Sequence, residues 1–178
     1  MEIVFPQDNE EKFIDIAIKL GYREICFAYA ENKLPRELTK TSKLSIKTAI
    51  LNPKNPARAK RNADFLIADE NARTAFESKE IDIVFGLEAK AGKDFARQRD
   101  SGLNQVLCEI AAKKNKIYGF NFRDLLMAKN RSAIIGRMMQ NMMLCKKYKV
   151  NTIFFSGAKE PYEMRNEKDL KLFFQLLK

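Results

Sequence analysis

The sequence predicts an α/β protein whose fold is a TIM-barrel-like (β/α) barrel with about seven mostly parallel strands. Short apolar runs rich in β-branched and aromatic residues alternate with amphipathic segments along the chain, a pattern typical of a parallel sheet covered by helices. An open doubly wound sheet fits the same alternation. The strands follow one another at intervals of roughly 20 to 30 residues and several helices are short, which favours a compact barrel.

Each predicted strand is a short apolar run bounded by polar or turn-forming residues. Residues 81–89, IDIVFGLEA, have the strongest β character, and the NPKNP sequence interrupts the chain after the third strand. The predicted strands cover residues 1–5, 24–30, 44–51, 64–69, 81–89, 117–122 and 151–158.

The predicted helices connect these strands. The first has an apolar face and ends at Gly21, a residue suited to a helix C-terminus. A helix over 101–114 is expected to begin at a cap formed by Asp100 or Ser101. The remaining helices are predicted over residues 9–20, 57–63, 71–79, 124–148 with a break near Asn130, and 164–177.

The length and composition predict one folded domain. The chain has 178 residues, 46% of them hydrophobic, which is enough for a single sizeable core. We therefore interpret residues 1–178 as one domain. No apolar run approaches the length of a membrane span, and the N-terminus lacks a signal-peptide pattern. We expect a cytoplasmic protein with no membrane partner.

The charge distribution is strongly asymmetric. The net charge is +10, yet residues 1–85 hold 14 basic and 14 acidic side chains, whereas residues 89–149 hold 14 basic and only 4 acidic ones. A neutral half joined to a basic half indicates a surface that binds a polyanion, of which nucleic acid is the commonest. The alternative is a solvated lysine-rich face with no partner.

The chain contains no histidine, which excludes several kinds of active site. A Ser-His-Asp triad, a histidine general base and a histidine metal ligand are all impossible. Asp69 and Glu88 follow apolar strands and would converge at a barrel mouth, where two carboxylates make at best a weak magnesium site. A free-standing magnesium phosphoesterase is therefore the runner-up, and a protein–protein scaffold with an incidental basic face is a third reading.

The stretch from Glu88 to Asn121 concentrates the functional signals. It contains a polar basic loop, an amphipathic helix and a strand, and such a loop lies at the carboxyl end of a parallel sheet, where sites usually form. Arg97 and Arg99 are two residues apart, so their forked guanidinium groups point the same way in an extended loop and match phosphate oxygens. The helix start beyond them would add free N–H groups.

Other basic residues extend this surface. Lys113, Lys114 and Lys116 lie at the opposite end of the same helix, so they form a separate patch. Arg137 is interpreted as a solvated charge, as are Lys146, Lys147 and Lys149.

Three motifs resemble a known family. DFARQRDSGLNQVLCEIAAKKNKIYGFNF is followed by AIIGRMMQNMMLCKKYKV and then by SGA and MRNEKDL. In this order they are similar to the archaeal ribonuclease P protein component 3 family, and the resemblance covers most of the chain. It implies a TIM-barrel-like fold and a subunit of the ribonucleoprotein that removes the 5′ leader from precursor tRNA, whose RNA carries the catalytic centre.

The resemblance also implies partners. These are the ribonuclease P RNA, precursor tRNA through the holoenzyme, other ribonuclease P proteins, and the component 2 protein in a heterotetramer of two pairs. We expect no catalytic residue, metal ligand or cofactor in this chain, and Mg²⁺ bound by the RNA of the holoenzyme. The predicted RNA contacts are Lys90, Lys93, Arg97, Arg99, Lys113, Lys114, Arg123 and Arg131.

Overall fold

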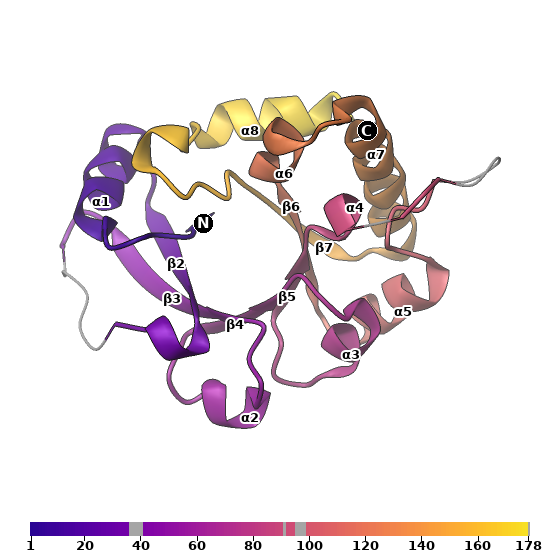
Figure 1. Cartoon of the computed structure of the whole chain (residues 1–178), viewed down its shortest axis with the longest axis horizontal. Coiled ribbons are helices and arrows are strands. Elements are labelled where there is room, and N and C mark those ends of the chain that lie inside the picture. The colour runs from indigo at the N-terminus through magenta and orange to yellow at the C-terminus, as the bar shows by residue number, and fades with distance from the viewer. Residues whose placement is uncertain (36–40, 91, 95–98, 178) are drawn as a thin grey trace.

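Seven parallel strands form one sheet in chain order and curl into a nearly closed barrel (Figure 1). The computed structural model describes residues 1–35, 41–90, 92–94 and 99–177. The strands are β1 (Glu2–Val4), β2 (Glu24–Ala30), β3 (Ser45–Leu51), β4 (Phe65–Ala68), β5 (Ile83–Phe85), β6 (Ile117–Asn121) and β7 (Asn151–Phe155). The predicted α/β class and the TIM-barrel-like arrangement of seven strands are confirmed.

Helices connect the strands and cover the outside of the sheet (Figure 1). They are α1 (Glu10–Lys19), α2 (Pro56–Ala59), α3 (Ala72–Glu77), α4 (Leu87–Lys90), α5 (Gln105–Lys113), α6 (Phe122–Met127), α7 (Arg131–Tyr148) and α8 (Glu167–Gln175). Two short 3₁₀ helices lie at Glu31–Lys33 and Pro161–Glu163. No helix in the described parts of the chain is long and apolar enough to cross a membrane.

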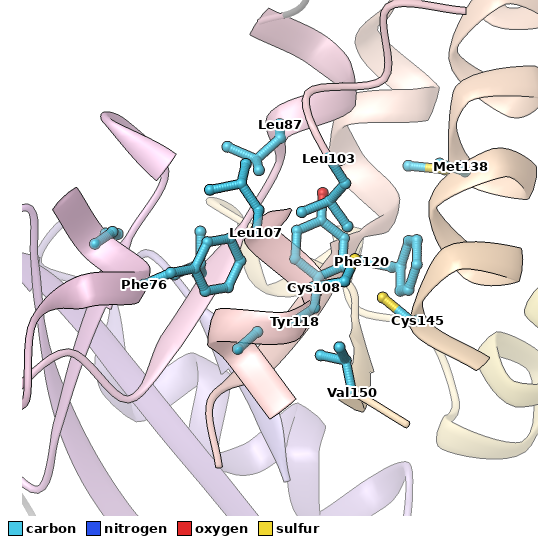
Figure 2. Packing of buried hydrophobic residues seen from close by; sticks show 14 of the residues in the cluster. Phe76, Leu87, Leu103, Leu107, Cys108, Tyr118, Phe120, Met138, Cys145 and Val150 are labelled. Atoms are coloured by element: carbon cyan, nitrogen blue, oxygen red, sulfur yellow. The ribbon is translucent and has the colours of Figure 1, made fainter. Parts of the chain in front are cut away.

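The barrel interior and its outer layer are built from alternate residues of the strands. Ile67, Ile83, Phe85 and Phe155 fill the interior with their neighbours, because side chains one residue apart point to opposite faces of a strand. The intervening residues pack outward against the helices. Figure 2 shows this outer layer, in which Tyr118 lies among side chains of α3, α5 and α7.

Side chains and one backbone contact close the barrel between its first and last strands. The Glu2 carboxylate accepts hydrogen bonds from the Ser156 backbone at 2.9 Å and from the Ser156 hydroxyl. The Phe5 N–H donates to the Ala158 carbonyl at 2.8 Å. The Tyr22 hydroxyl donates to Glu2 at 3.1 Å, so this fully buried carboxylate is well supplied with donors at the seam.

Several predicted boundaries were wrong, among them the end of the last strand, which stops at Phe155 and not at Ala158. The fifth strand ends at Phe85, and the residues LEA beyond it belong to α4. The next helix begins at Gln105 with Asn104 as its N-cap, not at Asp100 or Ser101. The last helix begins at Glu167, behind Asn166. The predicted break near Asn130 is confirmed between α6 and α7.

Candidate nucleic-acid interface

The segment that joins α4 to α5, residues 91–104, is called the basic loop below. It follows β5 and therefore lies at the carboxyl end of the barrel, as predicted. Its described residues are 92–94 and 99–104. Helix α7 packs beside α4 and α5 and supplies polar side chains that hold this loop in place.

Arg137 of α7 is the main anchor of the loop. Its side chain is buried, with 8% of the residue exposed. Its Nε donates to Asp94 Oδ1 at 2.8 Å, its Nη1 donates to the Glu88 carbonyl at 3.1 Å, and its Nη2 donates to the Gly92 carbonyl. The Arg137 hydrogen bond holds the pKa of Asp94 below its usual value. The prediction that Arg137 is a solvated charge was therefore wrong.

Gln140 and Asn141 hold the other end of the same loop. Gln140 Nε2 donates to the Arg99 carbonyl at 3.0 Å and to Ser101 Oγ at 2.8 Å, and its Oε1 accepts from the Arg99 N–H at 3.3 Å. Asn141 is fully buried and donates to the Ser101 carbonyl at 2.8 Å. Arg137, Gln140 and Asn141 occupy positions i, i+3 and i+4, so they share one face of α7.

Gly136 provides space for the Arg99 side chain. A Cβ atom at Gly136 would lie 2.3 Å from Arg99 Cζ and 2.5 Å from its Nε. The Arg99 guanidinium therefore lies against the backbone of α7. It also faces Asp94 at 3.5 Å, and its side chain remains 48% exposed. One side of this cation is held by the protein while another side is open to solvent.

The predicted contacts near the loop differ in how much of their charge is compensated. Lys90, at the end of α4, forms ion pairs with Asp69 at 2.8 Å and Glu70 at 3.4 Å. Lys93 is exposed. Arg97 lies outside the described residues. Among the described cations in and beside this loop, Lys93 and Arg99 therefore have less of their charge compensated than Lys90.

Two further predicted contacts lie at the starts of the next helices. Arg123 of α6 is partly buried and forms an ion pair with Glu163, so much of its charge is compensated. Arg131 is exposed and opens α7, where its Nη2 donates to the Leu126 carbonyl at 2.9 Å. Because α6 follows the carboxyl end of β6 and α7 follows α6, these residues belong to the same end of the barrel as the basic loop.

Lys113 and Lys114 lie at the other end of the barrel. They terminate α5 just before β6 begins, and both are exposed. The structure therefore does not bring them together with Lys93 and Arg99, as the sequence already indicated. Lys116, in contrast, is buried and donates to the carbonyls of Lys79 at 3.0 Å and Ile81 at 2.5 Å.

A cavity of about 200 Å³ occupies the carboxyl mouth of the barrel. Asp69 and Asp124 both line it. Burial raises the pKa of Asp124 to about 6, with a smaller contribution from the charge of Asp69. Asp69 accepts a hydrogen bond from Asn52 at 2.6 Å and pairs with Lys90. Across the described residues there is no group of three or more side chains able to hold a metal ion.

Glu88 is a structural carboxyl group and does not join Asp69 at the mouth. It is fully buried, and its Oε1 accepts a hydrogen bond from Asn141 Nδ2 at 2.9 Å. The same Asn141 nitrogen donates to the Tyr118 hydroxyl at 3.2 Å. Burial raises the pKa of Glu88 to about 7. Its Oε2 and Asn141 Oδ1 have no hydrogen-bond partner among the described residues. Asp69 and Glu88 therefore do not converge at the mouth, and the alternative of a weak magnesium site formed by these two carboxylates was wrong.

Comparison with known proteins gives a consistent result. No family model matches the chain. A protein named Ribonuclease P protein component 3 from Methanosarcina barkeri is 28% identical over 177 residues, covering 90% of this chain and 71% of the relative. Its namesake from Methanosarcina mazei is 26% identical and covers 93% and 73%. One from Thermococcus kodakarensis is 33% identical over 49% of this chain and 40% of the relative.

The matched share of these relatives varies. Namesakes from Methanococcus vannielii and Methanococcus maripaludis are matched over between 41% and 58% of their own length. This chain thus spans about half of those proteins and about 70% of the two from Methanosarcina.

Two solved structures have the same fold. A chain of the cryo-EM structure of archaeal ribonuclease P with mature tRNA superposes with a TM-score of 0.75 at 20% identity, covering 99% of this chain and 82% of that chain. Histidinol phosphate phosphatase from Lactococcus lactis, complexed with zinc, L-histidinol and phosphate, gives a TM-score of 0.63 at 12% identity, covering 97% and 92%. At these identities the likeness concerns the fold alone.

Proposed function

From its similarity to proteins named Ribonuclease P protein component 3, we propose that this chain belongs to their family and is a non-catalytic protein subunit of ribonuclease P. That ribonucleoprotein removes the 5′ leader from precursor tRNA, and this subunit binds and supports the catalytic RNA. The observation that carries the proposal is the match to proteins of that name along 90% of the chain.

The chemistry of the described residues supports an accessory role. The chain has no histidine, and the described side chains include no metal-binding cluster. Glu88, one of two carboxylates required for a phosphoesterase, is buried beside Asn141. A basic surface without an active site suits a subunit that neutralises RNA phosphates.

The basic loop is the proposed centre of RNA contact. Lys93 and Arg99 present cations at the carboxyl end of the barrel, and Arg131 adds another at the start of α7. Phosphate contacts of this kind read the backbone and shape of a folded RNA rather than its bases. Arg97 completes the proposed pair with Arg99. Lys90 and Arg123, whose charges are already compensated, are proposed as weaker contacts.

The proposed partners follow from the family. They are the ribonuclease P RNA, the component 2 protein in a heterotetramer of two pairs, other ribonuclease P proteins, and precursor tRNA through the holoenzyme. The chain itself holds no cofactor in this proposal, and the Mg²⁺ ions of the reaction are bound by the RNA. The proposed location is the cytoplasm.

Reconstitution tests the role directly. Precursor-tRNA cleavage is measured with the ribonuclease P RNA and the other protein subunits, with this chain added or omitted. We expect the chain to raise the rate only when the RNA is present, and Arg97→Ala/Arg99→Ala to lose most of that increase while remaining folded. A rate that does not respond to the chain, or cleavage by the chain alone, would contradict the accessory role.

A further inference from the structure

Five exposed lysines gather at the amino end of the barrel, opposite the basic loop. In the β6–β7 ladder Ile117 pairs with Asn151. The helices that precede these strands, α5 and α7, pack against each other, so their C-termini emerge side by side. The exposed lysines at these two ends, called the lysine face below, are Lys113, Lys114, Lys146, Lys147 and Lys149.

No carboxylate in the described part of the chain pairs with the lysine face. Glu109 lies one turn before Lys113 but accepts its hydrogen bond from Gln105 at 2.9 Å. Lys114 donates to the Glu77 backbone carbonyl, which leaves its charge uncompensated. The five charges therefore equal half of the chain's net charge of +10. Helix C-termini favour cations. One or two at each of the two ends would account for at most four of the five lysines, and the α7 end holds three of them.

The backbone conformation of Lys149 is a separate observation about the lysine face. It ends α7 with φ of 57° and ψ of 37°, a left-handed conformation in which glycine is the usual residue. A residue with a side chain is strained there relative to glycine. The position nevertheless holds an exposed lysine, two residues before β7 begins.

The lysine face and the basic loop are too far apart for one small contact. The Arg99 guanidinium lies against Gly136 of α7, and Lys146 lies ten residues further along the same helix. At a rise of 1.5 Å per residue this separation is about 15 Å along the helix axis. A single phosphate group cannot contact both places.

We propose that the lysine face binds the phosphate backbone of a second segment of the ribonuclease P RNA, distinct from the segment at the basic loop. The inference rests on the proposed function and extends it. The subunit then bridges two parts of one folded RNA along α7 and holds them at a set separation. The lysines act as point charges on flexible stems, which suits backbone contacts without base readout.

Three variants of this chain, assembled with the other subunits, test the proposal. The first replaces all five lysines of the lysine face with Gln. The second is Lys93→Gln/Arg99→Gln at the basic loop. The matched control carries the same loss of five charges on other exposed lysines of the chain, Lys12, Lys19, Lys33, Lys43 and Lys168. Thermal unfolding verifies that each variant is folded. The readouts are RNA affinity against salt and a backbone footprint on the ribonuclease P RNA.

We expect the lysine-face variant to lose at least tenfold in affinity near 0.15 M salt, and its salt slope to fall by roughly 2 to 4, since each phosphate contact contributes about 0.7 to 0.9. It should lose protection in one RNA segment, while the loop variant loses protection in another. A lysine-face variant that matches the control, or that loses the same segment as the loop variant, overturns the proposal.

Other outcomes separate the remaining explanations. An unchanged footprint with loss of another protein subunit from the assembly would assign the lysine face to an acidic protein and overturn the RNA contact. If the unaltered chain neither binds nor stimulates the RNA, the proposed function itself is wrong. If only the RNA contact of the lysine face is wrong, the unaltered chain still stimulates precursor-tRNA cleavage.

Discussion

At the scale of single residues, Gly136 shows how a missing side chain can position a charged one. Glycine in a helix interior costs about 1 kcal/mol relative to alanine. Its presence in α7 is explained by Arg99, whose guanidinium occupies the space of the absent Cβ. Gln140 fixes the Arg99 backbone through its N–H and its carbonyl. The cation that we assign to RNA is therefore held in a defined place.

Gly136→Ala tests this arrangement without removing a charge. The added Cβ would lie 2.3 Å from Arg99 Cζ, so the guanidinium must move. We expect RNA affinity to fall, but by less than in Arg99→Ala because the displaced guanidinium keeps its charge, measured by binding of the ribonuclease P RNA. In an Arg99→Ala background the same change should leave affinity unchanged and raise the free energy of unfolding by about 1 kcal/mol.

Two results would contradict this role of Gly136. If Gly136→Ala binds RNA as the unaltered chain does while Arg99→Ala loses affinity, the position of the guanidinium against α7 does not matter. A fall in affinity that is the same with and without Arg99 would assign the effect to α7 itself.

At the scale of elements, asparagine repeatedly defines where helices begin. The side chains of Asn55, Asn104, Asn121, Asn130 and Asn166 each accept a hydrogen bond from a backbone N–H in the first turn of the following helix. This is the usual role of an N-cap. The sequence reading placed the start of α5 at Asp100 or Ser101 because both are also good caps, but these residues belong to the loop that α7 holds.

Asn104→Ala measures the contribution of one such cap. The Asn104 side chain accepts from the Leu107 N–H at 3.0 Å. Its loss should lower the free energy of unfolding by about 1 kcal/mol, measured by urea denaturation. Asn104→Asp keeps an acceptor next to the helix N-terminus and is the matched control, expected to remain within about 0.5 kcal/mol of the unaltered chain. Equal stability of both variants would mean that another residue caps α5.

At the scale of the whole molecule, two buried carboxyl groups link stability to pH. Burial raises the pKa of Glu2, at the seam of the barrel, to about 7. The pKa of Glu88, beneath α7, is likewise about 7. Both ordinary values are 4.5. The folded state therefore binds more protons than the unfolded chain between these values, and the stabilisation present at acid pH is lost as pH rises through 7.

Glu88→Gln should remove part of this pH dependence. The amide stays neutral and keeps an oxygen for Asn141 Nδ2, so no ionisation is forced into the core at alkaline pH. We expect the variant to gain on the order of 3 kcal/mol relative to the unaltered chain between pH 5 and pH 8. The measurement is the free energy of unfolding in urea at both pH values. An identical pH dependence in both proteins would contradict the raised pKa of Glu88.

The sequence alone determined the class of the fold and the asymmetry of its charge. Apolar runs at short intervals predict parallel strands, because both faces of the strands in a parallel sheet are buried. The carboxyl-end position of the basic loop followed from the order of strand, loop and helix. The absence of histidine excluded whole classes of active site before any contact was known.

Only the tertiary structure decided which polar residues are structural and which are exposed. Nothing in the local sequence distinguishes Arg137 and Lys116 from their solvated neighbours. Both are nevertheless buried and donate hydrogen bonds to backbone carbonyls far away in the sequence. Glu88 follows a strand as Asp69 does, but α4 turns it into the core against Asn141. These differences depend on which elements pack together, and the pairing of residues far apart in the chain is set by strand register and helix packing rather than by local pattern.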